Sequence, residues 1–198
     1  LREGLNQLVA QQALFGPVEC SLGLSAPTDR PEELPQCFRE ANDAICERLL
    51  EGSGRLLEGR PAASALAEEN LLERYGRSVE LVMDTLGQLQ AQQAVQQLEE
   101  SAGAVPGVRG RELLELVRSA GKLFALRVCG EDTRQETEQF EKQCLQCSRV
   151  SDLFVCLRQF QSRLLERTLQ RRESESQRPI RLAKQYVQSH YSENITLE

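Results

Sequence analysis

The residues best suited to chemistry are two cysteines, Cys144 and Cys147, which are separated by Leu145 and Gln146. A Cys-x-x-Cys pair can bind zinc or exchange electrons between thiols and a disulfide. Zinc takes four ligands, and the sequence has no second Cys-x-x-Cys and no Cys-x-x-His. A thioredoxin-like pair would lie where a strand meets a helix, whereas this pair continues a helical pattern with Phe140 on the same face. Core packing is our first interpretation, a thiol-based sensor using Cys144 and Cys147 is an alternative, and no metal site is expected.

The rest of the catalytic inventory is small. His190 is the single histidine, which excludes mechanisms that need a histidine pair, and we interpret it as a packing or capping residue beside Tyr191. Adjacent glutamates diverge on a helix, so pairs such as Glu32 and Glu33 are poor acid–base dyads. The sequence has no Gly-rich phosphate loop and no Gly-x-Ser-x-Gly motif. We therefore expect no enzymatic activity, no catalytic residue and no cofactor.

Composition describes a soluble protein of the cytoplasm. The 198 residues are 40% hydrophobic and 27% charged, and no apolar run approaches the roughly 18 residues of a membrane span. The seven cysteines are an odd number and follow no signal peptide, so a reducing compartment is expected. The net charge is −6, but residues 158–184 hold seven Arg and one Lys against three Glu. This basic run indicates either a solvated helix face or an arm near nucleic acid.

Residues 1–58 predict a small unit with one strand. A helix is expected over 1–14 and a strand over 18–24, where apolar and small residues alternate. A helix then begins at Thr28 to Pro31 and ends at Gly52. Its expected buried stripe consists of Leu34, Phe38, Ala41, Ile45 and Leu49. A lone strand must pair, so its partner is expected before residue 1 or in another copy of the chain.

From residue 66 onward every segment is expected to be helical. One seam with spacings of three and four must pack on another helix; it comprises Leu72, Tyr75, Val79, Val82 and Leu86. A break at Gly87, a loop over 102–110 and an end near Gly130 separate the next helices. A short helix over 135–147 and a long one over 150–171 complete the set. The buried positions expected in the helix that ends near Gly130 and in the long helix are Leu113, Val117, Ala120, Phe124, Leu153, Leu157, Phe160 and Leu164.

The fold class is therefore mainly α, a helical bundle with a short strand-containing N-terminal subregion. We expect three regions: 1–58, a helical connecting domain over 66–171, and 172–198. In the last region, polar residues 172–178 are expected to be a linker or the frayed end of the long helix, and Pro179 opens another helix.

The segment 180–198, which reads IRLAKQYVQSHYSENITLE, resembles the first helix of the AraC-type DNA-binding domain. The family pattern is a helix with Ala, Tyr-Ile or Tyr-Val, then His or Asn-Tyr, a polar turn and Ile-Thr/Ser-Leu-Glu. The resemblance implies that Ala183, Val187 and Tyr191 pack on a helix-turn-helix and that Thr196 caps the next helix. The domain is expected to be truncated at Glu198, so this segment should not bind DNA specifically.

Residues 21–25 (SLGLS), with 38–41 (FREA) and Ala44, resemble a second pattern of the same family. It occurs in the middle region of AraC-type response regulators, in a segment similar to a degenerate GGDEF-like domain. Phe38 stands where Tyr is commoner. The resemblance implies that residues 1–58 are a remnant of an α/β GGDEF-like domain.

The leading functional hypothesis is a signal-transmitting or effector-sensing middle segment of a two-component AraC-family transcription regulator. Its expected partners are a receiver domain in cis, a second copy of the chain in a homodimer, and DNA bound by the full-length protein. No membrane contact is expected. The alternatives are a helical protein-interaction scaffold and the thiol-based sensor.

Overall fold

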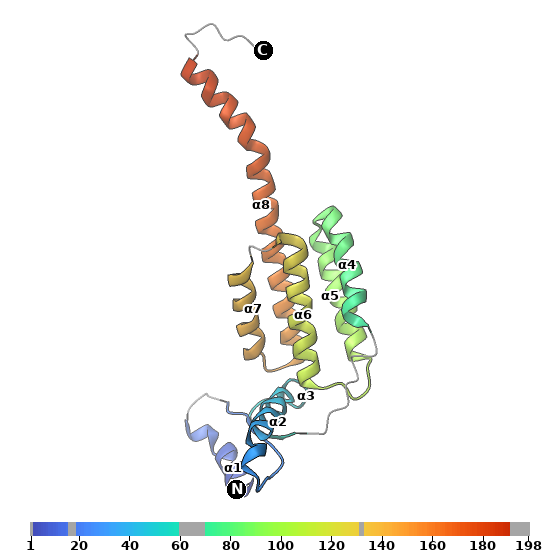
Figure 1. The fold of residues 1–198 in the computed structure, drawn as a ribbon, viewed down its shortest axis with the longest axis vertical. Helices are drawn as coiled ribbons and strands as arrows, with labels where there is room; N and C mark the ends of the chain where they lie inside the picture. Colours follow the sequence, from blue (N-terminus) through green and yellow to red (C-terminus); the bar gives the residue numbers. More distant parts are fainter. Residues whose placement is uncertain (1, 16–18, 60–69, 131–132, 191–198) are drawn as a thin grey trace.

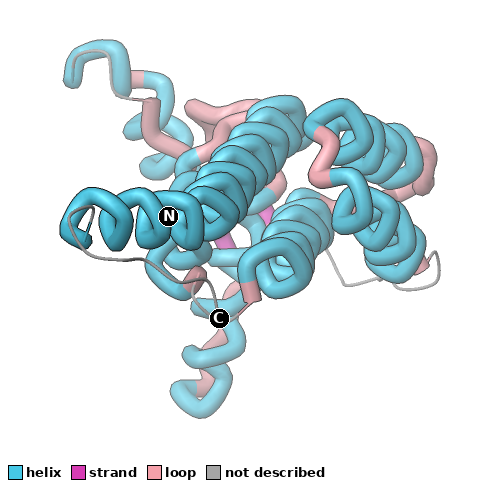
Figure 2. Tube along the Cα trace, turned by 90° about the horizontal axis from the view of Figure 1, so that it is seen from above, coloured by secondary structure: helices cyan, strands magenta, loops and turns pink. Residues whose placement is uncertain are grey.

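The computed structural model describes residues 2–15, 19–59, 70–130 and 133–190. An N-terminal unit lies at one end of the molecule, a helical bundle lies in the middle, and a single helix projects at the other end (Figure 1). Viewed along the long axis, the bundle helices surround a common core, and the short strands lie below it (Figure 2). The chain is mainly helical, as the sequence predicts.

The N-terminal unit is built on a β-α-β connection. Strands β1 (Leu22–Leu24) and β2 (Leu56–Glu58) form a parallel two-stranded sheet in which Gly23 is opposite Leu57. Helices α2 (Leu34–Cys46) and α3 (Arg48–Glu51) form the crossover between them. The expectation of a lone strand was therefore wrong, because β1 finds its partner within the same chain. The partner escaped notice because β2 is three residues long and too short to show alternation.

Close packing of α2 on β1 depends on a missing side chain. A Cβ atom on Gly23 would lie 2.0 Å from the carbonyl oxygen of Ala41, so only glycine lets the helix approach the strand this closely. The chain enters α2 through a 3₁₀ turn, Pro31–Glu33. Thr28 stabilises this turn, since its hydroxyl accepts from the Arg30 amide at 3.1 Å and donates to the Glu33 carboxylate at 2.6 Å. The first helix, α1 (Arg2–Ala10), is followed by a 3₁₀ turn over Gln12–Phe15.

The predicted buried stripe of α2 is only half correct. Leu49 is buried, but Leu34 is 60% exposed and Phe38 is 71% exposed. The small sheet covers only the C-terminal half of the helix, where Ala44 and Cys46 are buried. Apolar periodicity indicates which face a helix would bury, but not how far its partner extends.

The bundle consists of α4 (Leu71–Thr85), α5 (Gln88–Gly103), α6 (Gly110–Cys129), α7 (Arg134–Gln146) and the first half of α8 (Val150–His190). The predicted seam of α4 packs inside this bundle, with Val79 and Val82 fully buried and Leu72 partly buried. The breaks near Gly87, over 102–110 and at Gly130 are confirmed. All eight buried positions predicted in α6 and α8 lie in the core. On α5, Val95 and Leu98 are buried, whereas Leu89 is exposed.

Helix α8 runs without interruption from Val150 to His190. The polar stretch 172–178 therefore belongs to the helix rather than to an irregular linker, and it lies fully exposed. Its residues tolerate a helix, and the Arg171 guanidinium pairs with the Glu175 carboxylate one turn later at 3.1 Å. Pro179 lies inside the helix, which bends in its outer half (Figure 1). Despite this length, none of the helices in the described ranges is apolar enough to cross a membrane.

The close contact between α6 and α7 provides a test of the bundle. A Cβ atom on Gly121 would lie 2.2 Å from the Phe140 ring, whereas one on Gly103 would meet nothing within 4 Å. We expect Gly121→Ala to lower the free energy of unfolding by about 1–3 kcal/mol through overpacking. Gly103→Ala, the matched control, should change it by less than about 1 kcal/mol. Urea unfolding followed by circular dichroism measures both, and equal midpoints would contradict the packing described here.

Candidate functional site

The two cysteines singled out by the sequence lie at the end of α7, where the chain turns into α8. Cys144 is fully buried in the core. Cys147 directly follows the last residue of α7 and is half-buried. The neighbouring contact between these helices is aromatic: the rings of Phe140 and Phe160 stack with centroids 4.3 Å apart. Cys144 therefore packs as a core residue, in agreement with our first interpretation of the pair.

A third cysteine, which the sequence interpretation did not connect with the pair, completes the cluster. Cys156, in the second turn of α8, is buried and lies close enough to Cys144 and Cys147 to affect the pKa of both thiols. Cys144 lies three residues before the turn at 147–149 and Cys156 lies seven residues after it, so equal spacing about the turn does not identify Cys156 from the sequence.

The three thiols have distinct acidities. Hydrogen bonding to Cys156, followed by burial, raises the pKa of Cys144 far above its ordinary value. Burial raises the pKa of Cys147 to about 11. The pKa of Cys156 is lowered, first by the hydrogen bond from Cys144 and then by the positive charge of Arg163, against the opposing effect of burial. Of the three thiols, Cys144 is therefore the hardest to ionise and Cys156 the easiest.

The residues described here offer no metal-binding group of three or more His, Cys, Asp or Glu side chains. His190 is the last residue of α8, and its side chain lies outside the described part of the structure. The expected helix cap at Thr196 and the packing residue Tyr191 also lie outside the described residues.

An arginine from the N-terminal unit binds the turn that carries the thiols. Arg48, at the start of α3, donates from Nε to the carbonyl oxygen of Cys147 at 3.2 Å. Its Nη2 donates to the carbonyl of Leu145 at 2.6 Å, and its Nη1 donates to the carbonyl of Ile45 at 3.0 Å. The carbonyls at the end of a helix have no partner within the helix. A charged side chain from another part of the chain satisfies them here, so Arg48 ties the N-terminal unit to the α7–α8 turn.

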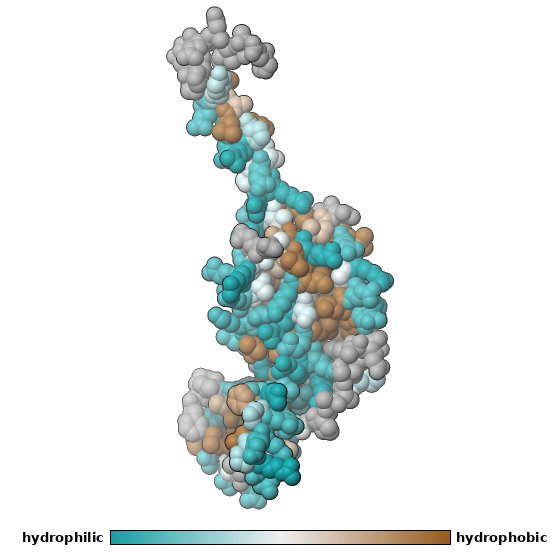
Figure 3. Space-filling view, in the orientation of Figure 1, coloured by the Kyte–Doolittle hydropathy of each residue, from teal (hydrophilic) through white to brown (hydrophobic). Residues whose placement is uncertain are grey.

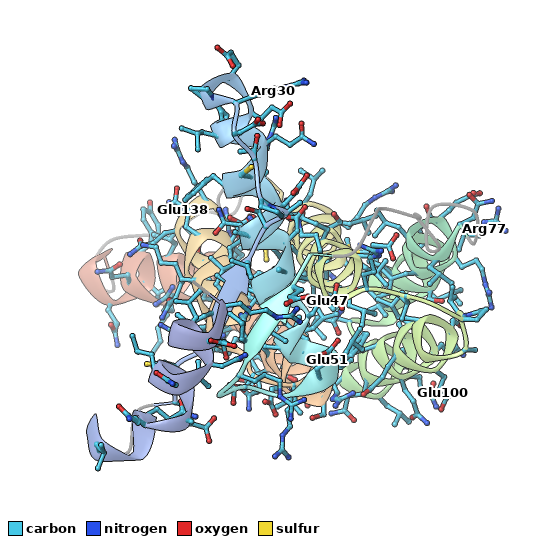
Figure 4. The ribbon with its side chains drawn as sticks, turned by 90° about the horizontal axis from the view of Figure 1, so that it is seen from below. Arg30, Glu47, Glu51, Arg77, Glu100 and Glu138 are labelled. Carbon is cyan, nitrogen blue, oxygen red and sulfur yellow. The ribbon has the colours of Figure 1, made fainter. Side chains whose placement is uncertain are left out.

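Backbone packing reinforces this junction. A Cβ atom on Gly110, the first residue of α6, would lie 2.0 Å from the carbonyl oxygen of Cys46 at the end of α2. The Arg111–Asp43 ion pair, at 2.8 Å, spans the same contact, but both side chains are about half exposed and the pair contributes little. Viewed from below, Glu47 and Glu51 lie under the bundle, whereas Arg77, Glu100 and Glu138 lie at its periphery (Figure 4).

A cleft of about 590 Å³ opens between the N-terminal unit and the bundle. This volume is within the usual range for small-molecule sites. Its charged lining residues are Glu19, Arg48, Arg111, Glu115 and Arg118. Most of these charges neutralise one another, since Glu115 pairs with both Arg111 and Arg118 at 3.3 and 3.1 Å. Within the described ranges, no acceptor reaches the buried Nε of Arg118. The charges that line the cleft are therefore largely paired within the protein.

Comparison of this chain with protein-family models, with curated proteins and with solved structures finds no match. The resemblances noted in the sequence therefore rest on the residues quoted for them.

The Arg48 contact can be tested by removing its charge and two of its donors. Arg48→Gln leaves the carbonyls of Leu145 and Cys147 without their partner, and we expect it to lower the free energy of unfolding by about 1–3 kcal/mol. Arg77→Gln is the matched control, because Arg77 makes an exposed pair with Glu73 one turn away. That change should stay within about 0.5 kcal/mol.

Urea unfolding measures both variants, and cleavage by trypsin at Arg149 reports on the turn directly. The Arg48 variant should be cut faster at Arg149 than the control. Equal stability and equal cleavage in the two variants would show that Arg48 does not hold the turn.

Proposed function

We propose that this chain is the non-catalytic, signal-transmitting middle segment of a cytoplasmic AraC-type response regulator. The observation that carries the proposal is the division of α8 into two halves. Residues such as Leu157 and Phe160 belong to the core of the bundle, whereas the helix beyond about residue 170 projects into solvent (Figures 1 and 3). A helix rises about 1.5 Å per residue, so a shift at the buried end is carried along α8 beyond the bundle.

The projecting half of α8 has one apolar face. At 100° per residue, its apolar side chains fall within an arc of about 160°. Four of them are more than half exposed: Ile180 at 70%, with Leu182, Tyr186 and Val187. The opposite face is basic or amide-bearing, comprising Arg178, Arg181, Lys184, Gln185 and Gln188. An apolar face of this kind is stabilised when it packs on another element. The resemblance of residues 180–198 to the AraC family implies that this element is a helix-turn-helix domain.

The N-terminal unit supports the same proposal. Its β-α-β connection contains the residues that resemble the GGDEF-like pattern, and Gly23 of that pattern makes the close contact between β1 and α2. We propose that the unit is a remnant of such a domain and that it receives the signal of a receiver domain in cis. Arg48 then connects it to the base of α8. The cleft at this junction is the proposed place for an effector.

The homodimer needs a different argument from the one that the sequence suggested. The seam over 72–86 is buried within its own bundle, and β1 is paired with β2, so neither requires a second copy of the chain. Exposed apolar surface remains along the outer half of α8 and over the groove between α6 and α4 (Figure 3). We propose that two copies pair through the exposed apolar surface of α4 and α6, because the apolar face of the outer half of α8 is assigned to the helix-turn-helix domain.

The proposal predicts that transmission depends on the helical phase between the bundle and residue 180. In the protein encoded by the complete reading frame, two residues inserted within 172–178 rotate the outer half of α8 by about 200°. Seven inserted residues rotate it by about 700°, which nearly restores the original phase. In the unmodified protein, we expect acetyl phosphate to change the affinity for DNA on the order of tenfold. The two-residue insertion should abolish this change, and the seven-residue insertion should preserve it.

The measurement is fluorescence anisotropy with DNA selected from a random pool by the unmodified protein. If the unmodified protein selects no DNA, the proposal of a transcription regulator is contradicted, and the alternative of a helical protein-interaction scaffold is favoured. If the two insertions give the same change of DNA affinity with acetyl phosphate, the protein binds DNA but α8 does not transmit the signal.

A further inference from the structure

The basic face of the outer half of α8 is a compact positive surface. Arg178, Arg181 and Lys184 are exposed, and their side chains border one shallow hollow on the helix. At 100° per residue they fall within an arc of about 120°, which is centred opposite the apolar face that carries Ile180. The helix therefore presents its three cations to one side and its apolar side chains to the other.

The positive charge of this face is not neutralised along the helix. The sequence has no Asp or Glu between Glu175 and Glu193. Glu175 lies one turn before Arg178, but its carboxylate pairs with the Arg171 guanidinium at 3.1 Å. The charge of residues 178–184 is thus left for a partner that approaches the helix from outside.

The charge of the chain is polarised along its long axis. Residues 1–58 hold five Arg against ten Asp and Glu, whereas residues 176–190 hold two Arg and one Lys and no Asp or Glu. These two regions lie at opposite ends of the molecule (Figure 1). An anionic polymer is therefore attracted to the outer half of α8 and repelled by the N-terminal unit, so the charges select the end of the molecule that it meets.

The spacing of the three cations matches the charge spacing of a nucleic-acid strand. From Arg178 to Lys184 the helix rises about 9 Å. One strand of B-DNA carries a phosphate for about every 3.4 Å of its axis, so this length corresponds to about three phosphates. Gln185 and Gln188 lie on the same face, and glutamine amides commonly donate to phosphate oxygens. The face therefore suits one DNA strand in both charge and length.

We propose that this face binds the phosphate backbone of DNA beside the site that the full-length protein recognises. The inference rests on the proposed function, in which the apolar face of the same helix packs on a helix-turn-helix domain and the basic face stays open. Phosphate contacts carry no sequence information. Arg178, Arg181 and Lys184 therefore add affinity and fix the orientation of the protein on DNA, without choosing the sequence.

Anionic lipid is the other source of phosphate for a basic amphipathic helix. A helix that lies on a membrane buries its apolar face in the lipid. Under the proposed function, Ile180 and the other side chains of that face pack on the helix-turn-helix domain, so the lipid would have to displace this domain. DNA needs the basic face alone, and this difference favours DNA as the partner.

The test removes the three cations together in the protein encoded by the complete reading frame, as the triple variant Arg178→Gln, Arg181→Gln and Lys184→Gln. Glutamine has a helix propensity close to that of Arg and Lys, so the helix is retained, and circular dichroism checks this. The matched control changes the net charge equally by replacing three exposed arginines elsewhere with Gln: Arg39, Arg55 and Arg77.

Fluorescence anisotropy measures the affinity for the selected DNA and for random-sequence DNA at several salt concentrations. Each lost phosphate contact lowers the slope of log affinity against log salt by about 0.9 in magnitude. We expect the triple variant to lower this slope by about 2.7 and the control to leave it unchanged. Between about 50 and 200 mM salt, the unmodified protein should lose about 40-fold more affinity than the triple variant. Both DNAs should show the same effect, because phosphate contacts do not depend on sequence.

Equal slopes for the triple variant and the control would overturn this inference and leave the proposed regulator intact, since the protein would still bind its DNA. A weakening confined to the selected DNA would show that these side chains read bases, which overturns the assignment to phosphates. If the unmodified protein selects no DNA but sediments with phosphatidylglycerol vesicles, and the triple variant stays in the supernatant, the face binds a membrane. That result contradicts both the proposed function and this inference.

Discussion

Burial of the first half of α8 is the interaction on which the rest of the structure depends. Its inward face is almost fully buried against α5, α6 and α7; the side chains are Leu153, Phe154, Leu157, Phe160, Leu164 and Leu165. Burying a large apolar side chain contributes roughly 1.5–3 kcal/mol. This face therefore contributes an amount comparable to the net stability of a typical domain, and without it α7 would lose the partner of its Phe140 ring. The position of the turn, the thiols and the outer helix all follow from this packing.

The contact between the N-terminal unit and the bundle has a different physical character. Cys46 and Leu49 join the hydrophobic core of the bundle, but the contact also depends on backbone atoms: Arg48 binds the carbonyls at the end of α7, and Gly110 allows α6 to approach the carbonyl of Cys46. Contacts of this kind are directional, so they fix an orientation more than they add burial. An apolar interface could slide by a small amount at little cost, whereas the Arg48 hydrogen bonds are lost by a displacement of about 1 Å.

The sequence predicted the bundle well because periodic burial leaves a periodic pattern. The seam of α4 and the stripes of α6 and α8 were identified residue by residue. Features that depend on pairing between distant segments were not accessible in the same way. Strand β2 is too short to carry a pattern, and the exposure of Phe38 depends on where the small sheet ends. In the candidate site, Cys144 and Cys147 were found by spacing, but Cys156 and Arg48 join them only through the α7–α8 turn.

Pro179 divides α8 into two segments with different thermodynamics. Proline has no amide hydrogen, so one helical hydrogen bond is missing at this point of an otherwise continuous helix. The part of α8 that packs in the bundle, up to about residue 170, shares the cooperative unfolding of the core, and its amides exchange with solvent only when the bundle opens. The segment after it, exposed on all sides that the structure describes, opens on its own at a cost close to that of an isolated peptide helix. One continuous helix therefore combines a rigid base with an outer segment whose order is set by whatever packs on it.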